Sequence, residues 1–251
     1  GDQTSLGFGI RYDRAANGDG SINPRIGLVH QWDAQTTFKF LFVTSFRAPN
    51  AYELYYAPSG YLLNPTLHSE TIATYELILE KRLDERTRIN ASVYHYNITN
   101  LIDLTTDPDS GLLTFRNLSH ARADGLTLEA MRDWTNGVRL RASYSWQLAE
   151  DEAGKWLDNS PRHLAKLNWS QPFFGDIWRA GTELQYVGKR RATRGNEVAG
   201  ALVANLNVLG RPFSKNLDVA LGVYNLFDQD YADPGADEHL QVEIPQDGRS
   251  W

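Results

Sequence analysis

Cysteine is absent from the 251 residues, and no apolar run approaches the length of a membrane-spanning helix. The lack of cysteine excludes a disulfide framework and thiol catalysis. The lack of a run of about 18 apolar residues excludes a helix as the means of crossing a bilayer. The net charge of −6 is accompanied by no dominant basic stripe, which argues against a nucleic-acid partner.

Motifs of enzymes and metal sites are also missing. The sequence contains no Gly-x-Ser-x-Gly, no His-Glu-x-x-His and no glycine-rich phosphate loop. The acidic loops 17–20 and 107–111 could supply oxygen ligands to Ca²⁺ but lack the full ligand spacing, so ordinary turns are the favoured interpretation. We predict a protein that is not an enzyme and has no cofactor or resident metal. The six histidines are scattered without metal-ligand spacing. A catalytic Ser-His or Asp-His pair that only the fold brings together stays open as an alternative.

Aromatic residues are abundant, with 7 Trp and 12 Tyr, although the mean hydropathy is only −0.46. In segment 138–148 the apolar and aromatic residues Val138, Leu140, Tyr144 and Trp146 share one face, and polar residues share the other. Alternation over about ten residues is typical of a tilted strand with lipid on one side and a polar lumen on the other. A sugar-binding β-protein could show the same aromatic content. In segment 217–228 the pattern does not decide which side would face lipid.

The connections between the predicted strands alternate between short, such as 33–35, 84–86 and 135–137, and long, such as 47–69 and 103–112. An outer-membrane barrel places tight turns at one end and long loops at the other, whereas a soluble sandwich has no reason to do so. We therefore predict an all-β fold, an antiparallel transmembrane β-barrel with short periplasmic turns and long extracellular loops and without a helix. The predicted strands cover residues 4–12, 22–32, 36–46, 70–83, 87–102, 113–134, 138–148, 162–171, 177–188, 198–210, 217–228 and 243–251.

A series of motifs in fixed order resembles the barrel of TonB-dependent outer-membrane receptors. The centre of this resemblance is a Phe-Arg-Ala-Pro step at 46–49, then Tyr52-Glu53-Leu54, then an Asn-Pro-x-Leu-x-x-Glu step at 64–70. The supporting pieces are residues 96–102, Asn117 with Gly125 and Glu129, 161–163, 223–231 and 245–249. Each piece is weak alone, but together they cover most of residues 36–251.

The resemblance implies more than the strand pattern does. It implies that residues 1–251 are the C-terminal portion, about twelve strands, of a barrel of about 22 strands in the outer membrane of a Gram-negative bacterium. The N-terminal plug domain, through which the family contacts TonB, would be absent from this sequence. The implied function is TonB-dependent uptake of a metal complex, with an iron-siderophore as the favoured cargo and cobalamin, haem or a glycan as alternatives. A passive porin-like channel and a soluble β-rich binding module are the competing classes.

Two groups of residues are candidates for ligand contact at the long loops. Arg47 either faces the ligand chamber or, as the favoured interpretation, anchors the loop by pairing with Glu53 or Glu70. Four tyrosines crowd the longest loop, where flat rings with hydroxyl tips would suit an aryl or macrocyclic ligand. An aromatic belt at the outer membrane interface is an equally weighted alternative. These tyrosines are Tyr52, Tyr55, Tyr56 and Tyr61.

A third group consists of cations on the polar side of predicted strands. Arg139, Arg141 and Arg179, together with Lys166, could draw an anionic metal chelate inward. Pairing with lumenal carboxylates such as Glu129 and Glu183 is the favoured alternative. The motif residues to which we assign a structural role are Phe46, Pro49, Glu53, Asn64, Pro65, Glu70, Asn225 and Phe227.

Overall fold

A computed structural model describes residues 3–15, 20–175, 177–193, 195–212, 216–236 and 239–251. The main feature is one antiparallel sheet in which each long strand pairs with its neighbour in sequence. The all-β antiparallel prediction is confirmed. The strands are β1 (Thr4–Arg14), β2 (Gly20–Asp33), β3 (Thr36–Arg47), β5 (Glu70–Arg82), β6 (Thr87–Thr106), β7 (Leu113–Asp133), β8 (Arg139–Asp151), β9 (His163–Phe173), β10 (Trp178–Val187), β13 (Ala201–Gly210) and β14 (Val219–Val223).

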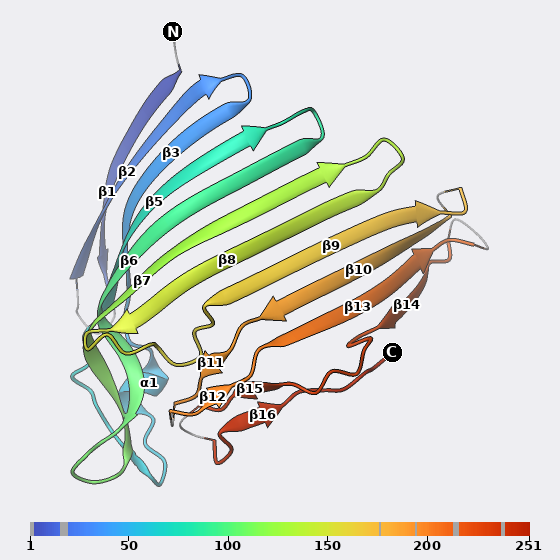
Figure 1. Ribbon diagram of the computed structural model, residues 1–251. Coiled ribbons are helices and arrows are strands. Elements are labelled where there is room, and N and C mark those ends of the chain that lie inside the picture. The colour runs from blue at the N-terminus through green and yellow to red at the C-terminus, as the bar shows by residue number, and fades with distance from the viewer. Residues whose placement is uncertain (1–2, 16–19, 176, 194, 213–215, 237–238) are drawn as a thin grey trace.

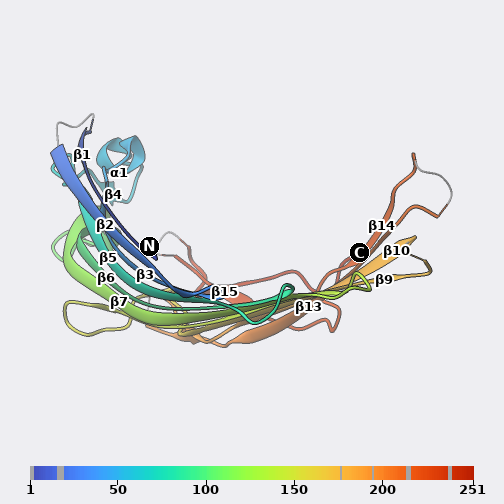
Figure 2. The same ribbon diagram turned by 90° about the horizontal axis from the view of Figure 1, so that it is seen from above.

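The sheet is curved into an open trough with β1 at one edge and β14 at the other (Figures 1 and 2). The tight turns β2–β3, β5–β6 and β7–β8 lie at one end, and the long connections β3–β5, β6–β7 and β8–β9 lie at the opposite end (Figure 1). We call these the turn end and the loop end. The predicted alternation of connection lengths is therefore observed as two distinct ends of the sheet.

Two of the tight turns are built from the same four-residue pattern. In the β2–β3 turn the Asp33 carboxylate accepts the backbone N–H of Gln35 at 2.7 Å and the Thr36 hydroxyl at 2.9 Å. In the β5–β6 turn Asp84 accepts Arg86 N–H at 2.7 Å and the Thr87 hydroxyl at 3.0 Å. An Asp side chain that bonds the backbone two residues on favours a turn. The Asp-x-x-Thr sequence therefore fixes where each strand reverses.

Short elements lie mainly at the loop end. They are α1 (Ala51–Tyr55), β4 (Tyr61–Leu62), β11 (Arg190–Arg191), β12 (Glu197–Val198), β15 (Ala232–Pro234) and β16 (Glu243–Pro245). The prediction of no helix is wrong for α1. The predicted last strand over 243–251 is also wrong, because Glu243–Pro245 pairs with β15, and only Ser250 pairs with Tyr224 at the sheet edge. Among the described residues, no helix is long and apolar enough to cross a membrane.

The two faces of the sheet differ in chemistry along its whole width. On one face the cross-strand neighbours Leu128, Tyr144, Ala165 and Tyr186 form an apolar and aromatic row. The register also assigns β14, where the sequence was ambiguous, because Leu221 lies opposite Val208 on this same face. Many of these side chains are solvent-exposed. An exposed apolar face of this size on a sheet marks a surface that contacts something other than water.

The opposite face is polar and concave. Across the same strands, Glu129, Ser143, Lys166 and Gln185 are successive neighbours. The polar face also carries Arg47, whose partner helix α1 lies on the inner side of the curve (Figure 2). The apolar face is therefore convex, as expected for a barrel wall with lipid outside and a polar lumen inside.

Aromatic side chains form a band near the turn end of the convex face. Trp134 and Trp169 have ring centroids 5.5 Å apart, and Phe173 and Trp178 have centroids 6.5 Å apart. Tyr186 is an aromatic residue on the same face near the other end of β10. It lies eight residues from Trp178, which is about 27 Å along the strand at roughly 3.4 Å per residue. Girdles of aromatic residues that flank an apolar band about 25 Å tall are typical of outer-membrane barrels.

Candidate functional site

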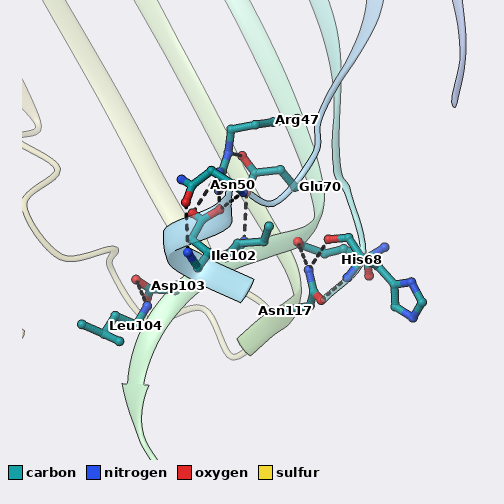
Figure 3. A network of polar contacts seen from close by, with 10 residues as sticks. Arg47, Asn50, His68, Glu70, Ile102, Asp103, Leu104 and Asn117 are labelled. Carbon is teal, nitrogen blue, oxygen red and sulfur yellow. Dashed lines mark hydrogen bonds and ion pairs between the residues drawn. The ribbon is translucent and has the colours of Figure 1, made fainter. Parts of the chain in front are cut away.

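The end of β3 is joined to three other elements through the Arg47 guanidinium (Figure 3). Its Nε donates to Glu70 at the start of β5 at 2.5 Å, and its Nη1 donates to both oxygens of Glu53 in α1 at 2.9 Å. The second oxygen of Glu70 accepts the backbone N–H of Ile102 in β6 at 2.9 Å. The side chains of Glu53 and Glu70 are largely buried, but neither is left as an unpaired buried charge, because both carboxylates bind Arg47. The two carboxylates that the sequence offered as partners therefore bind Arg47 together.

Helix α1 begins at a reciprocal cap. The Asn50 side chain accepts the backbone N–H of Glu53 at 2.9 Å, and the Glu53 carboxylate accepts the backbone N–H of Asn50 at 2.8 Å. This capping box satisfies two backbone donors that the first turn leaves open. A helix of five residues is too short to persist by intrinsic propensity. The cap and the Arg47 pair together hold it in place.

Two asparagines attach the second half of the long connection to the β6–β7 ribbon. Asn117 of β7 accepts the backbone N–H of His68 at 2.9 Å and donates to the carbonyls of His68, at 2.9 Å, and Asn100, at 2.7 Å (Figure 3). Asn64 donates to the Phe115 carbonyl at 2.9 Å. Strand β4 also pairs in parallel with residues 113–114 of β7. The connection is therefore bound along its length to an extended hairpin.

A small apolar core lies beneath these polar contacts. Leu54 of α1, Leu67 of the connection and Ile102 of β6 are buried together, and Phe115 of β7 packs against them. Residues 47–70 and 100–120 thus form one ordered unit at the loop end, which we call the tyrosine lobe.

The four candidate tyrosines lie in the first half of the tyrosine lobe. Tyr52 and Tyr56, one helical turn apart, are stacked with centroids 4.2 Å apart and planes 20° apart. Tyr52 also meets Phe115 edge-on at 5.8 Å, and Tyr56 meets Tyr61 edge-on at 6.1 Å. Tyr52, Tyr55 and Tyr56 remain 49%, 66% and 46% exposed. The structure brings the rings of Tyr52, Tyr56 and Tyr61 into contact, and Tyr55 belongs to the same helix, which is paired with Arg47 through Glu53.

The candidate arginines on the strands lie elsewhere. Arg139 is the first residue of β8 and Arg179 the second of β10, both at the turn end, and Arg141 is two residues further along β8. A strand of 13 residues such as β8 spans roughly 40 Å. These three arginines therefore cannot contact one small ligand together with the tyrosines of the lobe.

The predicted pairing of these cations with carboxylates of the same face occurs for Arg139, whose Nε lies 3.7 Å from Asp133 Oδ1 on the neighbouring strand. The pairs with Glu129 and Glu183 that the sequence suggested are not observed among the described residues. Arg179 donates instead to the Gly137 carbonyl at 3.0 Å and to the Ser170 hydroxyl at 2.9 Å. The strand register explains the absence of the other pairs. Ser143 lies between Lys166 and Glu129. In the same way a neutral residue, Asn168, separates Arg141 from Glu183.

The motif residues assigned a structural role behave differently from one another. Asn225 is 3% exposed with φ +48°, accepts Gln229 N–H at 2.8 Å and donates to the Gln229 and Asp247 carbonyls at 2.9 and 3.3 Å. It joins the motif at 223–231 to the motif at 245–249. Phe227 is 75% exposed and does not pack in a core. Pro49 is buried before the cap, Phe46 is half-buried in β3, and Pro65 is exposed.

The acidic loop at 107–111 is a turn held by its own backbone. The Asp107 carboxylate accepts the backbone N–H and the hydroxyl of Ser110, each at 2.9 Å, and it also binds Arg116. These hydrogen bonds and the nearby guanidinium hold the pKa of Asp107 below its ordinary value. The carboxylate is thus already occupied, as the turn interpretation expects. Residues 17–19 of the other acidic loop lie outside the described residues.

Sequence reasoning did not identify the role of Gly125. A Cβ at this position would lie 2.4 Å from the Tyr94 ring and 2.8 Å from the Trp146 carbonyl. Tyr94 lies over the glycine, stacks on Tyr96 with centroids 4.6 Å apart, and donates to Gln147 at 3.4 Å. The signal was available in part, because a glycine inside a strand pattern suggests a close approach. The partner could not be found without the register.

Comparison with known proteins decides the family. The family described as TonB dependent receptor-like, beta-barrel matches residues 1–226. The chain belongs to this family. Its sequence is 26% identical over 191 residues to the vitamin B12 transporter BtuB of Vibrio vulnificus, a match that covers 75% of this chain and 30% of that protein.

The chain is also similar to proteins named as receptors for iron complexes. Over 163 residues the chain is 28% identical to the catecholate siderophore receptor Fiu of Escherichia coli strain UTI89, covering 59% of this chain and 20% of that protein. A solved structure of a point mutant of the Pseudomonas aeruginosa ferric enterobactin receptor, in complex with enterobactin, superposes with TM-score 0.80 at 19% identity, covering 99% of this chain and 42% of that one. The last similarity shows the fold alone. The chain spans less than half the length of each of these proteins.

Proposed function

We propose that this chain is the C-terminal part of an outer-membrane receptor that takes up a metal complex in a TonB-dependent manner, with an iron-siderophore as the favoured cargo. The proposed location is the outer membrane of a Gram-negative bacterium. Membership of the TonB-dependent receptor family supports the proposed uptake function. The convex apolar face and the aromatic band at its turn end support the membrane location, because such a face would otherwise stay exposed to water.

The observation that carries the ligand-binding part of the proposal is the tyrosine lobe. It presents three exposed rings from an anchored helix at the loop end. A pre-organised site loses less conformational entropy when it binds than a flexible loop does. The residues proposed to contact the cargo are Tyr52, Tyr55, Tyr56 and Tyr61, with Arg47 positioning the helix. The turn-end residues Arg139, Arg141 and Arg179 would meet a ligand only after it has moved along the concave wall.

The proposed partners are outer-membrane lipid on the convex face and TonB, contacted through a plug domain outside these residues. A gated receptor of this kind binds its cargo at the loop end and releases it on the other side when the plug rearranges. The polar concave face supports this route, since a lumen must offer hydrogen bonds to a hydrated cargo and to a folded plug.

The experiment that tests the proposal uses the full-length parent protein in its own bacterium. Envelope fractionation should place it in the outer membrane, and deletion of its gene should reduce growth when chelated iron is the sole iron source. The growth defect should require intact TonB. Outer-membrane retention without an iron phenotype would contradict the iron cargo, and recovery as a soluble protein would contradict the membrane location.

A further inference from the structure

Two arginines face each other across neighbouring strands at the turn end of the concave face. Arg82, the last residue of β5, is the direct cross-strand partner of Arg88 in β6. Both residues are exposed. Like charges directly opposite each other in an antiparallel pair destabilise a sheet. The sheet therefore gains nothing from this pair by itself, whereas an anion bound between the two guanidinium groups would remove their repulsion.

A third arginine extends this row across the concave wall. Arg88 lies opposite Met131 of β7, and Met131 lies opposite Arg141 of β8. Met131 is two residues from Glu129, so the row belongs to the polar concave face, because alternate residues of a strand share a face. The backbone of Arg141 lies about 10 Å from that of Arg88, at roughly 4.8 Å between neighbouring strands. We call Arg82, Arg88 and Arg141 the arginine row.

The carboxylates that flank the arginine row along the same strands are bound elsewhere. Glu80 accepts Lys39 Nζ at 2.5 Å, and Glu129 accepts the Asn90 side chain at 3.3 Å. Asp133 lies 3.7 Å from an arginine outside the row. Among the residues that the structure describes, no salt bridge joins a carboxylate to a member of the row. The guanidinium groups of the row therefore have donors that no carboxylate of the wall accepts.

A cavity of about 280 Å³ lies beside Arg82 and Arg88. Its lining includes Glu80, whose carboxylate is the one that binds Lys39. Guanidinium and amide groups donate hydrogen bonds, and arginine can bind a carboxylate or a phosphate through two parallel N–H groups. The cavity thus offers donors to an oxyanion from more than one side. The lining residues with guanidinium or amide side chains are Gln31, Gln35, Arg82, Arg88 and Asn90.

We propose that Arg82 and Arg88 bind an oxyanion between them, a carboxylate or a phosphate, with Arg141 extending the site across the wall. This inference rests on the proposed function, because the turn end of the concave face is then the periplasmic end of the lumen. Two sources can supply the oxyanion there: an Asp or Glu side chain of the plug domain, and a free phosphate or carboxylate ion. A side chain bound at this site would attach the plug to the wall where the cargo leaves the lumen.

The first test asks whether a protein carboxylate occupies the site. In the full-length receptor purified in detergent, Arg88→Lys keeps the positive charge and adds a primary amine. A carbodiimide joins that amine to a carboxylate in direct contact, and peptide mass spectrometry identifies the pair. We expect a link from position 88 to an Asp or Glu outside residues 1–251. Arg86→Lys, in the exposed β5–β6 turn, is the matched control and should give at least tenfold less product. Lys39 and Glu80 provide an internal positive control.

The second test asks whether a free oxyanion occupies the site. Radioactive inorganic phosphate is equilibrated by dialysis with the parent receptor and with the double variant Arg82→Gln, Arg88→Gln. A site open to free ions should bind phosphate at least tenfold more weakly in the double variant, because both guanidinium groups are gone. Arg86→Gln should bind phosphate as the parent does. An unchanged urea midpoint of the double variant in detergent confirms that it is folded.

The two tests together decide the inference and the source. A link from position 88 to the plug assigns the site to a side-chain carboxylate. Phosphate binding that depends on the two arginines, without such a link, assigns it to a free ion. Absence of both results overturns the inference, as do links from position 88 only to Glu80 or Glu129, or equal products from the control. The proposed uptake stands in each case, because it is decided by the outer-membrane location and the iron phenotype.

Discussion

One nitrogen of Arg47 donates to both carboxylate oxygens of Glu53, at 2.9 Å each, and this carboxylate also caps helix α1. The last residue of a barrel-type strand is thereby joined directly to the helix that presents the tyrosines. Because Glu70 shares the same guanidinium and in turn accepts Ile102 N–H, a single side chain relates α1 to β3, β5 and β6.

The first prediction concerns this pairing. Arg47→Ala should destabilise α1 and the start of β5 by about 1 kcal/mol, because it leaves two carboxylates without their partner. This value is at the low end of the range for unpaired polar groups, because the Arg47 side chain is 43% exposed and the pair is partly screened by water. Hydrogen exchange of the full-length receptor should show faster exchange at the Leu54 and Ile102 amides. Glu85→Gln, in an exposed turn at the other end, is the control. Unchanged protection at both amides would show that the cap alone holds the helix.

The second prediction concerns the attachment of the connection to the β6–β7 ribbon. Asn117→Asp keeps the acceptor for His68 N–H but removes the donor to two carbonyls and places a charge beside them. A buried or half-buried carbonyl that is left without a hydrogen-bond donor lowers the stability by about 1–3 kcal/mol. Limited proteolysis should cut residues 57–69 faster in the variant than in the parent or in Ser59→Ala. Equal cleavage rates would show that β4 pairing is sufficient.

The strands were predicted well from the sequence where apolar and polar residues alternate over a long segment. Contacts that depend on which residues lie opposite on the neighbouring strand were predicted poorly. Segment 138–148 became most of β8 because its two faces differ at every step. Helix α1 was missed because five residues show no helical period, although the Asn50-x-x-Glu53 box was readable. The ion pairs of Lys166 and Arg141 were wrong because Ser143 and Asn168 lie between the partners, a fact that only the register contains.

The third prediction concerns the end of the chain. Segment 217–228 looked like one strand, but the regular strand ends at Val223, and Asn225 at φ +48° and Asp228 at φ +54° form a turn in which Asp228 N–H donates to the Asn225 carbonyl at 2.8 Å. Asn225→Leu would remove bonds to Gln229 and Asp247 and place a branched side chain where few residues adopt positive φ. We expect a loss of about 2–4 kcal/mol from these combined effects. The urea midpoint in detergent measures it, with exposed Phe227→Leu as the control that should change little.

The fourth prediction concerns pH. The pKa of Asp84 lies below its ordinary value of 3.8 because Arg86 N–H and the Thr87 hydroxyl donate to its carboxylate. A folded-state pKa below the unfolded one contributes stability that is present above the ordinary value and is lost as pH falls through the folded value. The β5–β6 turn should therefore loosen only on acidification below about pH 4. NMR shifts of the Arg86 amide should report this, and Asp84→Asn should remove the pH dependence. A transition above the ordinary value would contradict the assignment.

The last prediction concerns the concave wall at Gly125. Gly125→Ala would place a Cβ 2.4 Å from the Tyr94 ring, and the Trp146 carbonyl at 2.8 Å prevents relief by a backbone shift. The ring must then leave the wall, which costs about 1–3 kcal/mol as overpacking does. A double-mutant cycle separates this contact from the intrinsic preference of the strand for alanine over glycine. If the clash is the cause, Gly125→Ala should destabilise the parent but become neutral or stabilising in a Tyr94→Ala background, because alanine is the better strand residue once the ring is gone. Equal effects in both backgrounds would place the cost in the backbone at Trp146 instead.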